Sequence, residues 1–345
     1  MREGLRSPFA EIEFKDLESR GFVLVRGFLS EAEVQVCRED FASQSVNTEN
    51  RNYNLSSASG GAHDAVRSRV EEVLAQVRAR TDLVVDLPLH ASYFATARGV
   101  KFLWHQDHES FFAIQNHYDY LNFYIPIVKP RKDLSNLSII PFDALAREDP
   151  RTFARVVRGG ATRFRRMGER TMVLLDEPGT TLWMDGDLDR IAHTPELEPG
   201  DLLLIRGDVI HQTQDTETDR VSLSFRATRA ETPVHRQRLA DGGLPKAWMM
   251  MNDDRTYARM FAAFDALGRE VASYAELQAA IDALPPSEAM GRKRFFRYLL
   301  RRKWRDGVFT SIFRNTAGSW LTMLRAKLRS PRPRAVPAEP RPPSA

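Results

Sequence analysis

Trp104-His105-Gln106-Asp107 decides the fold of this 345-residue chain, together with a second stretch that runs Gly200-Asp201-Leu202-Leu203-Leu204-Ile205-Arg206-Gly207-Asp208-Val209-Ile210-His211. The first stretch places an imidazole and a carboxylate two residues apart. Alternate side chains of a β-strand point to one face, so His105 and Asp107 are expected to reach the same point. The second stretch is a turn, an apolar run of strand length and then His211, which can bring a third ligand there.

Two imidazoles and one carboxylate form the facial triad of non-heme Fe(II) oxygenases, which leaves coordination positions open for a co-substrate and dioxygen. We therefore predict a metal site at His105, Asp107 and His211. The competing interpretation is a set of ordinary, hydrogen-bonded polar groups in a β core. His108 adjoins the motif but is expected to point to the opposite face from Asp107 if the strand continues.

Most of residues 89–226 has the pattern of short strands separated by turns. Residues 120–127 alternate between polar and apolar side chains, which is typical of a strand with one buried face. The other predicted strands lie at 89–95, 100–104, 137–141, 171–175, 180–183, 201–205 and 220–226. Many short strands with turn signals between them predict a β-sandwich or barrel.

Helical patterns flank this region on the N-terminal side. A short strand at 22–25 leads to Ser30-Glu31-Ala32-Glu33, a capping box that predicts the start of a helix. Residues 66–79 carry valine and leucine at helical spacing and predict a helix that covers the core. Residues 44–62 are polar and rich in Ser, Asn and Gly, so we predict a long loop.

Two further helical regions are predicted within and after the strands. Residues 151–170 are expected to form a helical and basic excursion between two strands. After Thr232, helices are predicted at 257–267 and after Ser273-Tyr274-Ala275-Glu276, a second capping box. The chain is therefore expected to be mainly β with flanking helices and a helical C-terminal extension.

The composition is that of a soluble globular protein, with 42% hydrophobic and 28% charged residues. Cys37 is the only cysteine, which excludes an intrachain disulfide and a cysteine-built zinc cluster. The first six residues lack the apolar core of a signal peptide, and no run approaches the ~20 apolar residues of a membrane span. The expected location is the cytoplasm.

The net charge of +4 conceals an asymmetry along the chain. Residues 291–345 carry 15 Lys and Arg against two acidic residues, a net +13, so the other 290 residues carry 35 basic and 44 acidic groups, a net −9. An acidic body is not typical of a nucleic-acid-binding fold, where the basic patch belongs to the domain itself. No nucleic-acid partner is therefore expected.

The basic arm at 292–329 interleaves Lys and Arg with aromatic and aliphatic residues. This pattern is typical of a helix that lies on an anionic membrane surface. The favoured alternative is that the arm packs on the acidic body of its own chain or of a second subunit, which would be self-association. Residues 331–345 are rich in Pro and Arg and are expected to be disordered.

The stretch Gly21-Phe22-Val23-Leu24-Val25-Arg26-Gly27-Phe28-Leu29-Ser30, His105-Gln106-Asp107 and residues 199–211 resemble the phytanoyl-CoA dioxygenase-like family. Members of that family are Fe(II)- and 2-oxoglutarate-dependent oxygenases built on a double-stranded β-helix, a cupin-like jelly roll. The resemblance covers roughly residues 12–230. It implies an oxygenase domain at 1–230 with N-terminal helices, and leaves a helical extension at 231–330 and the tail at 331–345 unexplained.

A 2-oxoglutarate co-substrate needs a cation for its far carboxylate. Arg220 lies nine residues after His211, and Arg220-Val221-Ser222 puts a guanidinium and a hydroxyl on one strand face, which suits a carboxylate clamp. This Arg-x-Ser resembles a signature of related oxygenases. Arg226 lies on the same face and competes for the role.

Asn122 and Tyr124 share a face of the strand that follows the metal motif. They are candidates for contact with the keto-acid end of 2-oxoglutarate. The alternative is that they are ordinary polar groups that line the barrel.

The expected function is a dioxygenase that oxidises a C–H bond of a small molecule with O2 and releases succinate and CO2. The alternatives are a cupin-like isomerase or lyase that uses the metal without 2-oxoglutarate, and a non-catalytic sensor or scaffold. Where the family often has Asn-Gly and Pro-Gly-Ser-His, this chain has Ser135-Asn136-Leu137 and Ile140-Pro141-Phe142-Asp143. The resemblance therefore does not predict the substrate pocket of this chain. An anionic or lipid-like substrate is one hypothesis, suggested by Arg98, Lys101, Lys129, Arg131 and Lys132.

Overall fold

The computed structural model of the chain describes residues 12–44, 54–175, 181–215, 217–240 and 254–285, together with Phe9, Arg297 and Arg301. The predicted basic arm, apart from those two arginines, and the tail at 331–345 lie outside these residues and stay predictions. Within the described residues, no helix is both long and apolar enough to cross a lipid bilayer.

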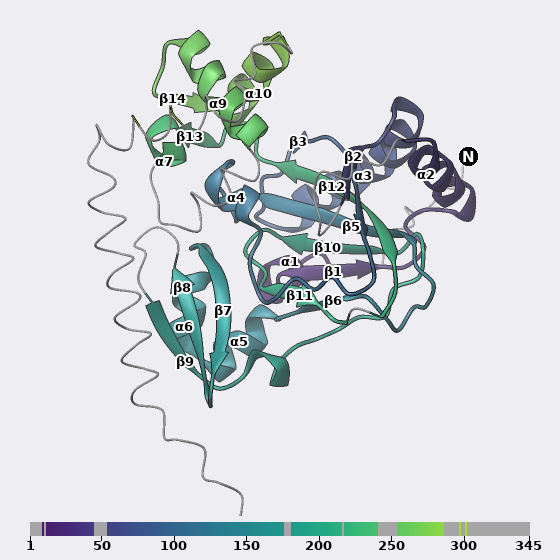
Figure 1. Cartoon of the computed structure of the whole chain (residues 1–345), viewed down its shortest axis with the longest axis vertical. Coiled ribbons are helices and arrows are strands. Elements are labelled where there is room, and N and C mark those ends of the chain that lie inside the picture. The colour runs from purple at the N-terminus through teal and green to yellow at the C-terminus, as the bar shows by residue number, and fades with distance from the viewer. Residues whose placement is uncertain are drawn as a thin grey trace, which may run out of the picture.

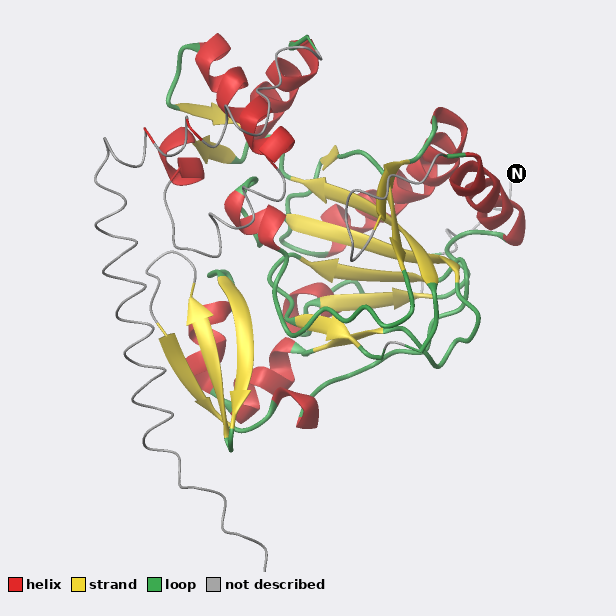
Figure 2. Cartoon of the chain, viewed as in Figure 1, coloured by secondary structure: helices red, strands yellow, loops and turns green. Residues whose placement is uncertain are grey.

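The centre of the molecule is one large antiparallel sheet with a smaller sheet facing it (Figures 1 and 2). The large sheet has the strand order β1-β10-β5-β12-β4-β2, with β3 (Leu87–Pro88) paired to β12. Its strands are β1 (Phe22–Val25), β2 (Asn54–Ser57), β4 (Ser92–Thr96), β5 (Tyr120–Val128), β10 (Leu202–Arg206) and β12 (Arg220–Thr228).

The small sheet pairs β6 (Leu137–Ile139) with β11 (His211–Thr213). Single bridges extend it at both edges, because His105 pairs with His211 and His193 pairs with Ile139. The chain thus winds through two facing sheets of four segments each. The order along the chain is β4, the segment at His105, β5, β6, the segment at His193, β10, β11 and β12. This winding confirms the predicted double-stranded β-helix.

Alternation along the strands gives the large sheet an apolar outer face and a mixed inner face, on which polar side chains of β5 and β12 lie beside Leu203 and Ile205 of β10. On β5, Phe123 and Ile125 join the main core, whereas Asn122 and Tyr124 lie on the other face. The outer face is covered by α2 (Glu31–Ser43) and α3 (Gly60–Arg80). A register shift in β12 lies opposite Pro126, which has no N–H to give to the ladder.

The helix predictions on the N-terminal side are partly confirmed. The Ser30–Glu33 capping box is present at the start of α2. The loop predicted at 44–62 is wrong in its described part, because β2 forms there and α3 begins at Gly60. Its polar residues mark a strand at the edge of the large sheet, where no other strand of the described residues pairs with its outer side.

The region between β6 and His193 also differs from its prediction. It contains α5 (Phe142–Glu148) and α6 (Pro150–Val156), and then a three-stranded antiparallel meander. The meander consists of β7 (Ala161–Met167), β8 (Arg170–Leu175) and β9 (Thr181–Asp185). The predicted helical excursion at 151–170 therefore ends at Val156, because Phe164 alternates with arginines as a strand residue.

The described part of the C-terminal extension contains α7 (Arg236–Ala240), α9 (Asp254–Leu267) and α10 (Tyr274–Ala283). It also contains a small ladder, β13 (Pro233–His235) with β14 (Val271–Ser273), that was not predicted. The predicted capping box at Ser273 is present. Phe261 and Phe264 of α9 share a core with Phe112 and Tyr120, so this unit packs against α4 (His108–Phe112), the helix that follows Asp107.

Candidate metal centre

The structure brings His105, Asp107 and His211 together. One ligand atom from each lies within 4.8 Å of the others, and His211 Nε2 is 3.8 Å from Asp107 Oδ1. The two histidines are direct cross-strand partners, since His105 N donates to His211 O (3.0 Å) and His211 N donates to His105 O (2.9 Å). Backbone pairing therefore fixes the separation of the two imidazoles before any metal binds.

Each imidazole is oriented by a carbonyl two residues earlier. His105 Nδ1 donates to Leu103 O at 2.6 Å, and His211 Nδ1 donates to Val209 O at 3.0 Å. Since a carbonyl oxygen only accepts, these bonds place the proton on Nδ1 and leave the Nε2 lone pair free. Burial lowers the pKa of His105 to about 3, with the charges of His211 and His108 adding to the shift. The ring is therefore neutral, as a metal ligand must be.

Asp107 reaches the site differently from the prediction. It is the residue before α4, in an extended conformation, but its side chain makes no capping hydrogen bond. The strand expected to carry both ligands is only a bridge at His105, and His108 already belongs to α4. The carboxylate is thus free of the usual N-cap role and faces the two histidines.

The Asp107 carboxylate is held ionised. Burial opposes ionisation, but the charges of His211 and Arg226 and a hydrogen bond from Asn122 keep its pKa below the usual range. Asn122 Nδ2 donates to Asp107 Oδ2 at 3.3 Å, and Ser224 Oγ donates to Asn122 Oδ1 at 2.9 Å. The structure thus places Asn122 as a support of the carboxylate.

Gln106, between two of the ligands, is a positioning residue that the sequence did not indicate. It is buried, and its Nε2 donates to Asp208 O at 2.6 Å and to Val156 O at 3.0 Å. One side chain thereby ties the first ligand stretch to the turn before His211 and to the end of α6. The only signal in the sequence is that Gln106 is polar although strand alternation turns its side chain away from the metal site and into the protein.

Behind this turn lies a fully buried ion pair. Arg206 binds Asp208 through two hydrogen bonds, Nε to Oδ1 (3.1 Å) and Nη2 to Oδ2 (2.6 Å), and Arg158 N also donates to Asp208 Oδ2 at 3.0 Å. The side chains of Arg206 and Asp208 are 2% and 0% exposed. Removing one partner leaves a buried charge uncompensated.

We therefore expect Asp208→Ala to lower the free energy of unfolding by about 3–5 kcal/mol. Asp143→Ala is the matched control, because Asp143 pairs with Arg147 on the surface and such pairs contribute only about 0–1 kcal/mol. Chemical denaturation of both variants measures the difference. Equal, small losses would show that the buried pair does not hold the turn.

A second polar cluster lies further along β12, around Arg220. Arg220 is 6% exposed, and its Nη2 donates to Thr213 Oγ1 at 3.3 Å. Its Nη1 has no hydrogen-bond partner among the described residues, and neither has the buried hydroxyl of Thr96. Thr96 is the cross-strand neighbour of Arg220, so the two unpartnered polar atoms belong to side chains on one face. Buried polar groups are normally satisfied, which indicates a site for an acceptor ligand.

Ser222 and Tyr124 belong to the same cluster. Hydrogen bonding with Ser222 and Arg220 moderates the rise that burial causes in the pKa of Tyr124. Lys129 is also close, because burial, followed by repulsion from Arg220, lowers its pKa to about 8. The structure thus places Tyr124 beside Arg220, while Asn122 lies beside Asp107.

Arg226, the competing cation, already has a partner. Its Nη1 lies 2.9 Å from Glu109 Oε2, and Tyr120 donates to the same carboxylate at 3.3 Å. Arg220 makes no ion pair with any other described residue, so of the two arginines it is the one free to bind an external carboxylate.

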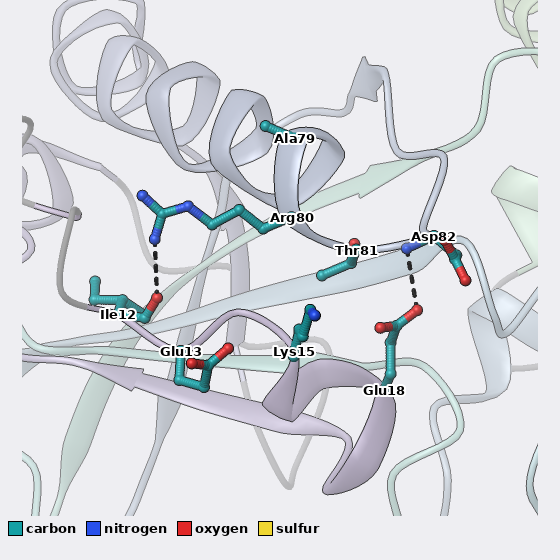
Figure 3. Close-up of a pocket in the computed structure, with 8 residues that line it drawn as sticks. All are labelled: Ile12, Glu13, Lys15, Glu18, Ala79, Arg80, Thr81 and Asp82. Carbon is teal, nitrogen blue, oxygen red and sulfur yellow. Dashed lines mark hydrogen bonds between the residues drawn. The ribbon is translucent and has the colours of Figure 1, made fainter.

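A separate polar hollow of about 800 Å³ lies between α1 (Asp16–Ser19) and the end of α3 (Figure 3). Arg80 Nη1 donates to Ile12 O, and Asp82 N donates to Glu18 Oε1. None of the three candidate ligands lines this hollow. It is therefore distinct from the candidate metal centre.

Comparison with solved structures finds similar chains at low sequence identity. The α-ketoglutarate-dependent epimerase SnoN from nogalamycin biosynthesis is 14% identical, with a TM-score of 0.42 over 63% of this chain and 81% of its own. A Pseudomonas putida prolyl-4-hydroxylase is 14% identical (TM-score 0.42, 63% and 96%). HygX from Streptomyces hygroscopicus, solved with nickel and 2-oxoglutarate, is 16% identical (TM-score 0.39, 62% and 84%).

No protein-family model matches the sequence, and no curated protein matches it either. The resemblance to phytanoyl-CoA dioxygenases therefore stays a prediction.

Proposed function

We propose that the protein is an Fe(II)- and 2-oxoglutarate-dependent oxygenase that oxidises a C–H bond of a small molecule. The observation that carries this proposal is the combination of a His105–Asp107–His211 triad with Arg220, a buried cation that forms no ion pair with a described residue. Two imidazoles and a carboxylate suit Fe(II) and leave one side open. An isomerase that uses the metal alone has no need of the free guanidinium.

Iron with 2-oxoglutarate bound would supply the activation of O2, so that one oxygen atom enters succinate, the other enters the substrate, and CO2 leaves. The residues of the chain supply position and charge. His105, Asp107 and His211 would hold the metal, and Asn122 keeps Asp107 in place. Arg220 with Thr96, Ser222 and Tyr124 would bind the far carboxylate, since a fork of N–H groups and hydroxyls matches its oxygens.

The test is anaerobic loading with Fe(II), followed by addition of 2-oxoglutarate and air and measurement of succinate. Release of one succinate per O2 consumed supports an oxygenase, because each turnover uses one O2 and puts one of its atoms into succinate and the other into the substrate. Binding of iron without succinate release, in the presence and absence of candidate substrates, would favour the metal-binding sensor or scaffold.

The lowered pKa of Lys129 leads us to expect that the affinity for 2-oxoglutarate varies with pH. Its pKa in the free protein is about 8, because burial and Arg220 oppose its charge. A bound carboxylate would favour the charged form and raise this pKa. Below pH 8 Lys129 is charged in both states and affinity is constant. As the pH rises above 8, binding must take up a proton and affinity falls.

Calorimetric titration between pH 7 and 9.5 measures this dependence. Lys129→Met keeps the volume but has no titrating group, so its affinity should be flat over the same range. The other charges near Lys129 are Arg220, Asp215 and Asp133, and neither acid titrates there because both pKa values are lowered. A wild-type curve parallel to that of the variant would contradict the prediction.

A further inference from the structure

The meander of β7, β8 and β9 lies directly beside the stretch that ends in His105. Phe164 N on β7 donates to Trp104 O at 3.3 Å, and β7 is the meander strand nearest the barrel (Figure 1). Just before β7, the chain lies against α4, since a side chain at Gly160 would meet the ring of Phe111 at 2.2 Å. The start of the meander therefore borders the stretch that carries His105 and Asp107 on both of its sides.

Strand alternation decides which face of β7 points to the metal site. Phe164 is buried in the same core as its neighbours on β8 and β9, and Trp104 packs against that core. His105 follows Trp104 and therefore points to the other face. Arg163 and Arg165, on either side of Phe164, lie on that face too.

These two arginines are unused cations. Both are exposed, and neither forms an ion pair with another described residue. Arg166, on the opposite face, pairs with Asp187 and donates to Gly168 O.

Apolar side chains accompany the two charges. Leu174 on β8 is the register partner of Arg163, and Trp183 on β9 shares the face and is half-buried. Leu103, two residues before His105, is 68% exposed and adds apolar surface beside the polar centre. An anion that binds here thus has apolar surface around it.

We propose that Arg163 and Arg165 bind the carboxylate or phosphate of an anionic substrate whose apolar body lies along Leu103, Leu174 and Trp183 toward the triad. The charge complementarity and the continuity of this face with the candidate metal centre favour a small amphiphilic anion. The proposal rests on the proposed function, and it replaces the loop lysines and arginines of the sequence hypothesis with a pair on one strand.

Octanoate, octyl phosphate and neutral octanamide are the probes. They are titrated by calorimetry, in the absence of oxygen, into protein loaded with Fe(II) and saturated with 2-oxoglutarate. The 2-oxoglutarate occupies Arg220, so the probes cannot bind there. The wild-type protein should bind the two anions at least tenfold more tightly than octanamide, or ~1.4 kcal/mol. Arg163→Ala/Arg165→Ala should remove that preference, and Arg166→Ala should retain it.

Equal binding of anion and amide by the wild-type protein, or an unchanged preference in the double variant, overturns the proposal. No binding of either anion at millimolar concentration also overturns it. A preference for one anion identifies the headgroup as carboxylate or phosphate. The double variant should keep the wild-type affinity for 2-oxoglutarate, which separates loss of the substrate site from loss of the centre.

If the wild-type protein releases no succinate with any substrate, the proposed function fails, while the titrations still decide whether the arginine pair binds anions. The two failures are therefore distinguishable. Loss of iron or 2-oxoglutarate binding in the double variant would show that the pair supports the metal centre itself, and would overturn a role confined to the substrate.

Discussion

His105→Ala, Asp107→Ala and His211→Ala are each expected to abolish succinate release and to weaken Fe(II) binding by more than 100-fold. Supporting partners of metal ligands alone change affinity by about 10–100-fold, so loss of a ligand should exceed that range. Anaerobic titration with Fe(II) measures affinity, and succinate release measures turnover. Retention of full iron affinity by Asp107→Ala would show that the carboxylate assignment is wrong.

His193→Ala is the matched control for the histidine variants. His193 also lies in the small sheet, where it bridges Ile139, but its ring stacks on Phe22, with the ring centroids 5.5 Å apart, and is not part of the triad. It should keep wild-type iron affinity. Asn122→Ala should give an intermediate loss of about 10–100-fold, since it removes the hydrogen bond to Asp107 but no ligand.

Local signals in the sequence predicted the strands of a sandwich or barrel and the three candidate ligands, whereas the double-stranded β-helix was implied by the family resemblance. Apolar alternation in β5 and the apolar run of β10 identify buried strands, and a Pro-Gly turn marks the start of the run. The route by which His105 and Asp107 converge was not predictable. It depends on one backbone bridge to His211 and on the start of α4, which are tertiary features.

The meander and the support of the site were missed for a related reason. Among the β7 side chains that the structure describes, the buried apolar one, Phe164, lies among arginines, and the strand conformation of β7 depends on pairing with β8. Local propensity cannot reveal such a strand. Gln106 and Thr96 are equally silent in the sequence, because their meaning lies in partners about 50 to 120 residues away.

Asn122 shows the limit of reasoning from strand faces. Alternation correctly placed Asn122 and Tyr124 on the inner face of β5. It could not tell which group each side chain meets, and the structure puts Asn122 on Asp107 and Tyr124 beside Arg220 and Ser222. One face of a strand therefore serves two different parts of the site.

Arg220→Ala is expected to weaken 2-oxoglutarate binding by roughly 30-fold or more while leaving Fe(II) affinity unchanged. Loss of a buried cation that pairs with a carboxylate costs about 2–5 kcal/mol, and ~1.4 kcal/mol corresponds to tenfold. Arg220→Lys should recover part of the loss, because an ammonium keeps the charge but not the fork of donors. Thr96→Val removes only the unpartnered hydroxyl and should have a smaller effect of about 3–10-fold, for a hydrogen bond of ~1 kcal/mol.

Arg226→Ala separates the two candidate cations. Because Arg226 is paired with Glu109, its removal should change 2-oxoglutarate affinity much less than Arg220→Ala. Its cost should fall on stability, because Glu109 loses its ion-pair partner and keeps only the hydrogen bond from Tyr120. Calorimetric titration of 2-oxoglutarate into the two Fe(II)-loaded variants without oxygen measures the affinity of each. If Arg226→Ala has the larger effect on 2-oxoglutarate and Arg220→Ala the smaller, the carboxylate clamp is Arg226, and the unpartnered Arg220 Nη1 needs another ligand.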